Sequence, residues 1–428
     1  MSALVGTNRP EVVDADDWLH SARPSLRRGV RVGPELLEGA RRVHVVYDPA
    51  SEAYLRIGVK EAFLLRRMDG TATVAEIGAA YAAQFGRRLA AGNWAQLLAL
   101  LHRHELTEPS DPVRLAELRT ATLQRRRAAG RTLWHYRIPV PGMTRLLARV
   151  APAAGWLLTP TVVVVGCLLG LAGSFALASD FGEIARTAGT GYSVSASLAA
   201  FVTWWLVVLA HELAHGMACL RYGGQPTEIG IMWRFPLLAP YCKVDDIFTF
   251  DRGQRVMTSF AGVYVHIAAQ APIALIWNLA QPDSWAHHVI AVIAAMNLIS
   301  IVVNLVPVLH LDGYHMLEGW LSCLRLQTQS FTYVGSLIGR AGSPRADYSA
   351  RARRIYLGYS LLAASIIIPL VAAVLTLWYR TLAPYVGAAG ALAILATEAA
   401  ILGILGRWAA RRRVRRAQDQ EARALANV

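Results

Sequence analysis

Two histidines and a glutamate stand close together in the segment His211-Glu212-Leu213-Ala214-His215. Residues four positions apart lie on one face of a helix, so the imidazoles of His211 and His215 can bind one Zn²⁺ ion. Glu212, between them, can act as a general base toward water that the metal activates. The segment therefore predicts the catalytic part of a zinc hydrolase.

A zinc hydrolase needs a third protein ligand and leaves the fourth coordination position open. The soluble metzincin pattern would place a histidine at position 221, where this chain has Arg221. A better candidate is Asp312, in the segment from Asn304 to Tyr314 with the sequence NLVPVLHLDGY. Pro307 ends a helix ahead of this aspartate, and Gly313 allows the backbone to approach closely. Asp312 is therefore the expected third ligand.

The candidate metal ligands lie in or next to long uncharged segments, which would place them at the same depth in a membrane. Lys, Arg, Asp and Glu are absent from five long runs, and Glu398 is the only such residue in a sixth. A helix needs about 20 apolar residues to cross a membrane. The runs predict about six transmembrane helices, at about 156–178, 196–220, 256–279, 286–307, 355–378 and 384–406.

The chain of 428 residues is 54% hydrophobic and only 17% charged, yet its formal net charge is +14. These values indicate a membrane protein and exclude the disordered, collagen-like and disulfide-rich classes. Of the 43 Lys and Arg residues, only Arg186 and Arg380 lie in the loops on one side of the six spans. The other side, with both termini, is then the cytoplasm, and the chain is expected in the cell membrane. Attraction to the lipid bilayer explains the charge, with nucleic acid the minor alternative and not expected as a partner.

The two motifs together resemble the site-2 protease family of intramembrane zinc metalloproteases. That family pairs HExxH in one transmembrane helix with an Asn- and Pro-containing motif ending in Leu-Asp-Gly in another, and the resemblance covers about 195–320. It implies a Zn²⁺ cofactor held by His211, His215 and Asp312, with Glu212 as the base and Asn304 polarising the substrate or the oxyanion. One departure is Ala261-Gly262-Val263, where many relatives have Gly-Pro after the Ala. This difference suggests a divergent branch of the family.

The segment Thr227–Met232 predicts a short strand, and Pro236 and Pro240 are expected to stop regular structure after it. An extended substrate can add to the edge of such a strand through backbone hydrogen bonds. Thr227, Ile229 and Ile231 are therefore the expected substrate-binding residues, with an ordinary interfacial loop as the alternative.

Other histidines are weaker candidates. His310, beside the Leu-Asp-Gly turn, is expected to support a metal ligand through a hydrogen bond. His266 and His315 are expected to serve in packing or in a similar supporting role.

The first part of the chain predicts a separate domain. Residues 1–41, rich in Pro, Gly and Arg, are expected to form a flexible arm. Val43–Tyr47 and Ala53–Ile57 predict two strands, followed by three helices at about 59–68, 73–85 and 93–102. They form a small winged-helix-like α+β domain over 42–110. A basic linker with a juxtamembrane helix follows at 111–155, then a transmembrane domain at 156–408 and a basic cytosolic tail at 409–428.

The small domain is similar to the PqqD-like leader-recognition domains of ribosomal peptide natural-product pathways. The similarity rests on the order of the elements, on Val59-Lys60-Glu61-Ala62 and on the phrase from Met68 to Ile77, MDGTATVAEI. It implies a leader peptide that adds to the small sheet as a strand. A DNA-binding winged helix and a purely structural cap are the alternatives.

The sequence thus predicts a polytopic α-helical membrane protein with a cytosolic N-terminal domain, acting as an intramembrane zinc metalloendopeptidase. Its expected task is to remove the leader of a ribosomally made peptide precursor near the cytoplasmic membrane face. Regulated cleavage of a membrane-bound signalling protein is the alternative, although the non-cytoplasmic loops are too short for the PDZ domains of many signalling relatives. A non-catalytic sensor or anchor stabilised by zinc is the alternative of another class, against which the intact Glu212 argues.

Overall fold

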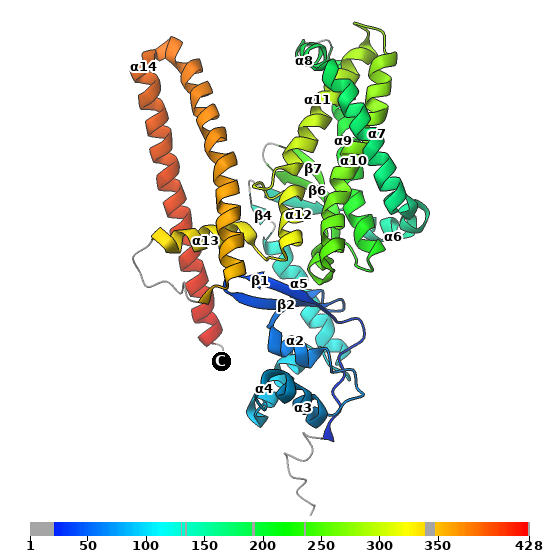
Figure 1. Cartoon of the computed structure of the whole chain (residues 1–428), viewed down its shortest axis with the longest axis vertical. Helices are drawn as coiled ribbons and strands as arrows, with labels where there is room; N and C mark the ends of the chain where they lie inside the picture. Colours follow the sequence, from blue (N-terminus) through cyan, green and yellow to red (C-terminus); the bar gives the residue numbers. More distant parts are fainter. Residues whose placement is uncertain are drawn as a thin grey trace, which may run out of the picture. The chain divides into compact units, whose positions relative to one another are not determined.

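The computed structural model describes residues 21–129, 131–132, 135–190, 193–234, 237–338 and 347–426. The chain divides into two compact units, Met1–Leu357 and Gly358–Val428. The first unit contains two β-sheets and the helices that carry the predicted metal ligands (Figure 1). The second is formed by most of one long helical element, α14 (Ala350–Ala426).

The N-terminal sheet contains three antiparallel strands in the order β1 (Arg31–Glu38), β2 (Arg41–Asp48) and β3 (Ala53–Gly58). The predicted strands and helices are present, with the helices observed as α2 (Val59–Leu65), α3 (Val74–Phe85) and α4 (Ala91–Arg103).

Residues 1–41 were expected to form a flexible arm, but Arg31–Glu38 within this range form strand β1, so the expectation is wrong there. Residues 1–20 lie outside the described residues. Gly33 and Pro34 fall where the register between β1 and β2 shifts, between Val32 and Glu35. Such an irregularity lets a strand continue past residues that usually end one.

Both faces of this sheet are packed. Val46 and Ile57 face the core that α2, α3 and α4 form. On the other face, Leu36 and Val45 pack with Phe248 and Leu324. The N-terminal domain therefore packs directly on segments that belong to the helical part of the same unit.

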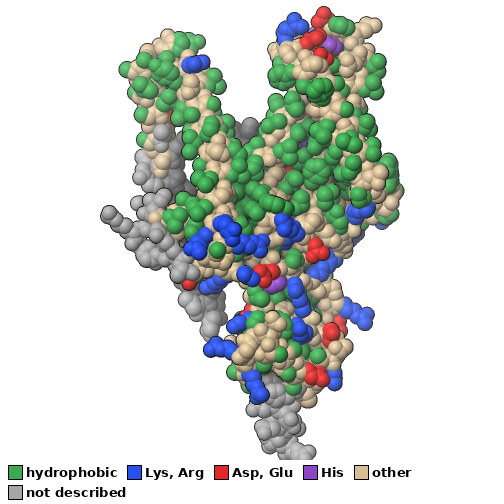
Figure 2. All heavy atoms as spheres, in the orientation of Figure 1, with side chains coloured by type: hydrophobic (Ala, Val, Ile, Leu, Met, Phe, Trp, Pro, Cys, Tyr) green, Lys and Arg blue, Asp and Glu red, His purple; other side chains and the backbone are tan. Residues whose placement is uncertain are grey.

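Five helices within the described residues are long and apolar enough to cross a membrane, by length and composition. Four are α7 (Pro160–Ser179), α9 (Val194–Arg221), α10 (Arg252–Leu279) and α11 (Trp285–Leu305), and the fifth is α14 as far as Glu398. Figure 2 shows hydrophobic side chains covering these helices, and Phe175 is 84% exposed. Exposed apolar surface on this scale is typical of a helical membrane protein.

The last two predicted spans, 355–378 and 384–406, form one helical element, so five helices are found where about six were expected. The 49 residues from Ala350 to Glu398 would extend about 75 Å as a straight helix, although a hydrocarbon core is only about 30 Å thick. Gly387, with φ 74° and ψ 166°, interrupts the helix. Figure 1 shows α14 turning back on itself, so its two arms correspond to the two predicted spans.

The predicted linker contributes strands to a second sheet. It contains α5 (Pro112–Ala129), β4 (Arg131–Thr132), β5 (His135–Pro139) and α6 (Met143–Ala154), and the sheet has the order β4-β5-β6-β7. The predicted strand after Thr227 is present as β6 (Glu228–Arg234).

The expectation that Pro240 stops regular structure is wrong, because this residue lies within β7 (Leu237–Lys243). Pro236 lies outside the described residues. β7 is an edge strand, where a proline is tolerated if its nitrogen faces away from the sheet. Short elements complete the first unit: η1 (Gly155–Leu158), α8 (Phe181–Gly189), η2 (Asp245–Thr249), α12 (Asp312–Leu321) and α13 (Leu326–Ile338).

Candidate metal centre

The three predicted zinc ligands meet at one point. His211 and His215 lie one turn apart on α9, and Asp312 is the first residue of α12. The Nε2 atom of His211 lies 3.2 Å from Nε2 of His215 and 3.1 Å from Oδ2 of Asp312. The Nε2 atom of His215 lies 3.2 Å from Oδ1 of Asp312. Residues 97 or more positions apart in the sequence are thus brought together as a group that can hold a metal ion.

These distances fit a zinc ion. Ligand atoms at about 2.0–2.1 Å from Zn²⁺ in a tetrahedron lie about 3.3 Å from one another. The three measured separations fall within a few tenths of an ångström of that value. Two imidazoles and one carboxylate are also a donor set that zinc accepts, with one position left open. The cluster can therefore hold a metal ion, and its spacing is compatible with zinc.

Backbone and side-chain contacts hold the imidazoles in place. Nδ1 of His215 lies 2.8 Å from the carbonyl oxygen of Thr258, on α10, so this ring nitrogen can donate its proton and present Nε2 to a metal. The ring of His211 packs against that of His266, with 4.9 Å between their centroids. Nδ1 of His266 in turn lies 2.6 Å from Oδ1 of Asn297. The expectation that His266 serves in packing or support is therefore met.

Gly262 forms the wall of the cluster on α10. A β-carbon there would lie 2.6 Å from both Cε1 and Nε2 of His211. Only glycine leaves the imidazoles room at this crossing of α9 and α10. The departure noted in the sequence is Val263, the residue that directly follows this glycine.

Glu212 lies between the metal ligands and the second sheet. Its Oε1 is 4.0 Å from Nε2 of His211, and its Oε2 accepts a hydrogen bond of 2.8 Å from the backbone N–H of Cys242 in β7. The side chain is 22% exposed, whereas that of His211 is 6% exposed. A carboxylate in this position can take up a proton beside the cluster and is held there by the sheet.

The outer edge of β7 faces α9. Ile229 of β6 is paired with Cys242, so Cys242 and Pro240 direct their backbone groups away from β6. On the same side, the indole nitrogen of Trp205 donates to the carbonyl oxygen of Leu238 over 3.2 Å. The carbonyl groups of Pro240 and Cys242 therefore lie along an edge that leads to Glu212.

The predicted substrate strand is not an edge. β6 is paired with β5 on one side and with β7 on the other, so Ile229 and Ile231 lie in an interior strand. Thr227 donates from its backbone N–H to the carbonyl oxygen of Lys243 over 2.9 Å. The assignment of Thr227, Ile229 and Ile231 as edge residues that bind substrate is wrong, because β5 from the linker occupies that edge.

Three further candidates, Asn304, His310 and His315, make no hydrogen bond with a metal ligand among the described residues. Nδ2 of Asn304 donates to the carbonyl oxygen of Ser300, one turn earlier on α11, over 2.9 Å. The prediction for His310 is wrong: its side chain is exposed and packs on Tyr314, with 4.7 Å between the ring centroids. His315 lies 3.4 Å from Oε2 of Glu318 and is also exposed.

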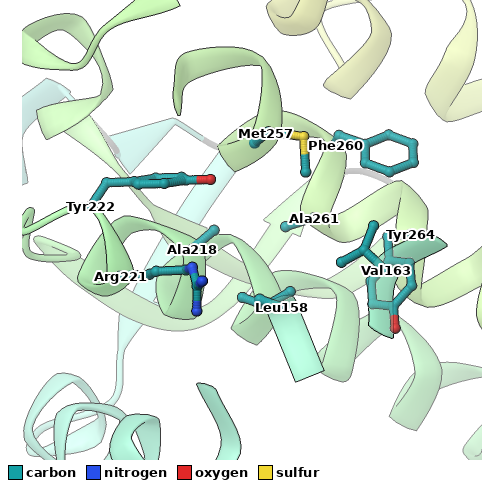
Figure 3. Close-up of a pocket in the computed structure, with 9 residues that line it drawn as sticks. All are labelled: Leu158, Val163, Ala218, Arg221, Tyr222, Met257, Phe260, Ala261 and Tyr264. Atoms are coloured by element: carbon teal, nitrogen blue, oxygen red, sulfur yellow. The ribbon is translucent and has the colours of Figure 1, made fainter. Parts of the chain in front are cut away.

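A small pocket lies beside the cluster, between α7, α9 and α10 (Figure 3). Ala218, Ala261 and Tyr264 are among the residues that line it, and its volume is about 10 Å³. A space of this size holds at most about one water molecule. It is therefore too small to receive a peptide.

The prediction from sequence missed three supports of the site: Gly262 as its wall, Thr258 as the acceptor for His215, and Cys242 as the donor to Glu212. Only Gly262 could have been recognised from the sequence, because a glycine inside a helix is unfavourable and usually indicates close packing at that position. Comparison of the chain with protein-family models, with curated proteins and with solved structures found no match. The interpretation of the site therefore depends on its own geometry.

Proposed function

We propose that the protein is a zinc-dependent endopeptidase of the site-2 protease type, with its active site near the cytoplasmic face of the cell membrane. The observation that carries this proposal is the position of Glu212. Its carboxylate lies beside the His211–His215–Asp312 cluster and is bonded to an edge strand on its other side. A general base next to both a metal and a peptide-binding edge is the arrangement that peptide hydrolysis needs.

His211, His215 and Asp312 hold the metal in this proposal. A bound Zn²⁺ ion supplies Lewis acidity, which activates water and polarises the scissile carbonyl group. Glu212 takes the proton from the attacking water and returns it to the leaving nitrogen atom. Asn304 would stabilise charge on the carbonyl oxygen only after its amide leaves Ser300, which it bonds in this structure.

The substrate is an extended peptide that reaches the cluster along the outer edge of β7. There the carbonyl groups of Pro240 and Cys242 can accept backbone hydrogen bonds from it. An extended chain exposes its peptide bonds, whereas a helix uses them internally. The edge therefore presents an unwound segment to Glu212.

Removal of the leader from a ribosomally made peptide is the proposed biological reaction. The N-terminal sheet supports this choice, because within the described part of the chain β3 pairs only with β2 and can receive another strand. The same domain packs on the helical part of its unit. Regulated cleavage of a membrane-bound signalling protein is the second candidate, since that reaction would use the same metal centre.

The test is co-expression of the chain with candidate short precursor peptides, with the product termini read by mass spectrometry. The Glu212→Gln variant is expected to bind zinc as the parent does and to release no product. Glu183→Gln, which changes a partly exposed glutamate on α8, is the matched control and is expected to cleave normally. Cleavage by Glu212→Gln at the parent rate would exclude the proposed mechanism, and zinc binding without any cleavage would favour a non-catalytic protein.

A further inference from the structure

A pocket of about 380 Å³ lies between the N-terminal sheet and the segments that follow β7 and α12. The sheet contributes Val45 from β2, together with Tyr54 and Arg56 from β3. The helical part of the unit contributes Lys243, Phe248 and Arg325, among others. We call this space the bridging pocket. Its volume is within the range of about 300–1,000 Å³ found for ligand sites.

The bridging pocket is lined by residues of β3 and of β7, the last strands of their two sheets among the described residues. Arg56 belongs to β3, which pairs only with β2 among the residues that the structure describes. Lys243 directly follows Cys242, whose backbone N–H bonds the carboxylate of Glu212. A chain that leaves the edge of β3 and crosses the pocket would therefore reach Lys243, which is one residue from Cys242, the hydrogen-bond donor to the proposed base.

The floor of the pocket is apolar and fixed. Val45, Phe248 and Leu324 pack together there, and Val45 and Leu324 are 4% and 5% exposed. Tyr54 is held by a hydrogen bond of 3.0 Å from its hydroxyl to Oδ1 of Asp246. The walls are thus preformed, which lowers the entropic cost of binding a ligand.

The rim of the pocket is positively charged. Arg56 pairs with Glu38 and Lys243 pairs with Asp245, each at 2.7 Å. Arg325 is exposed and has no acidic partner among the residues that the structure describes. Asp245 also lines the pocket and two of the three cations are paired, so the positive charge that attracts an anionic ligand comes mainly from Arg325.

We infer that the bridging pocket binds an extended segment of the substrate peptide that carries an acidic side chain. This segment lies between the part held by β3 and the part presented along β7. The inference rests on the proposed function for the identity of the ligand as a peptide. Alternate side chains of an extended segment point to opposite sides, so the acidic residue faces the rim while its apolar neighbours can face Phe248 and Leu324.

The test measures binding instead of cleavage, so it does not depend on the outcome for the proposed mechanism. The full chain with the Glu212→Gln substitution is purified in detergent and titrated against two fluorescein-labelled synthetic peptides of 16 residues. The peptides share a sequence rich in Val and Thr and differ only at three alternate positions, which are Glu in one and Lys in the other. We expect the Glu peptide to bind at least about tenfold more tightly than the Lys peptide.

Charge reversal locates the binding to the pocket. Arg325→Glu is expected to weaken binding of the Glu peptide about tenfold and to remove the preference over the Lys peptide. Arg88→Glu is the matched control, since Arg88 is an exposed cation of the N-terminal domain that does not line the pocket, and it is expected to change nothing. Circular dichroism and zinc content verify that each variant is folded.

Three results would overturn the inference: no measurable binding of either peptide, equal affinity for both, or an Arg325→Glu variant that behaves like Arg88→Glu. Binding with the expected charge preference in a protein that cleaves nothing would leave the pocket assigned and refute only the peptidase activity.

Discussion

A β-carbon added at Gly262 would lie 2.5 Å from Nε2 of His215. Gly262 is on α10 and His215 is on α9, so the two helices lie close together where the metal ligands sit. The absence of a side chain at this position lets the imidazole rings occupy the space between the helices. The backbone of α10 is therefore as much a part of the metal centre as the ligands that α9 provides.

The Gly262→Ala variant is expected to lose most of its zinc. The added methyl group meets two ring atoms of His211 and one of His215 at 2.5–2.6 Å, so at least one imidazole must leave its position. Metal analysis of the purified protein is expected to show less than about a tenth of the parent zinc content.

The control for this experiment is Gly253→Ala. Gly253 lies on the same helix, and a β-carbon there meets no atom within 4 Å. That variant should retain its zinc, and a Gly262→Ala protein with full zinc content would show that α10 does not form the wall of the site.

The Asp312→Asn variant tests the third ligand. Each carboxylate oxygen of Asp312 faces one imidazole, at 3.1 and 3.2 Å. The amide replaces one of these oxygens by a donor and removes the negative charge that stabilises a dication. Zinc content is expected to fall at least about tenfold, because changes to a metal ligand or to its hydrogen-bond partners usually lower metal affinity by that factor or more. Asp283→Asn, in an αL position that asparagine tolerates, is the control, and full zinc occupancy in Asp312→Asn would remove Asp312 from the ligand set.

The metal ligands were predictable from sequence because their placement is mostly local. His211 and His215 share a face through helical periodicity alone. Asp312 begins a helix directly after a break at Pro307, and Gly313 permits the close approach there, since a β-carbon would lie 2.4 Å from the carbonyl oxygen of Leu305. Strongly apolar runs likewise predicted the spans, since length and composition decide them.

The surroundings of the ligands depend on contacts between distant segments. β6 looked like an edge strand because β5, which covers it, comes from the linker some 90 residues earlier in the sequence. The outward position of His310 and the bond from Asn304 to Ser300 depend on how α12 leaves α11. β1 was not predicted because Gly33 and Pro34 are typical turn residues, and the strand continues past them because the residues on either side pair with β2.

Zinc is expected to stabilise the folded protein. A ligand that binds only the native state at about 100 times its Kd adds about 2.7 kcal/mol. The melting temperature of the parent protein in detergent should therefore rise on addition of Zn²⁺ and fall with a chelator. The His211→Ala variant, which lacks one ligand, should respond to neither, and an identical zinc response in this variant would place the bound metal elsewhere.

Cys323 reports whether the N-terminal domain stays packed on α12. The backbone N–H of Leu37 in β1 donates to the carbonyl oxygen of Ser322, and Leu324 donates back to that of Leu37, each over 2.8 Å. Cys323, between them, is 2% exposed. Burial raises the pKa of its thiol from 9.0 to about 12.

Labelling of Cys323 by a maleimide at pH 8 is therefore expected to be slow. The raised pKa makes the thiolate of Cys323 scarce at pH 8, and this reactive form becomes abundant only as the pH approaches 12. Mass spectrometry of proteolytic peptides separates this cysteine from Cys167, Cys219 and Cys242, all of which are free.

The Leu37→Pro variant is expected to label at Cys323 at least about ten times faster than the parent. Proline removes the N–H that bonds Ser322 and leaves the pairing of β1 with β2 on its other side. Packing against Leu324 then weakens, Cys323 reaches solvent, and its thiol pKa falls toward the ordinary value. Leu37→Val keeps the N–H and should label at the parent rate. Equal labelling of all three proteins would show that this backbone pairing does not hold the N-terminal domain against α12, the helix that begins with Asp312.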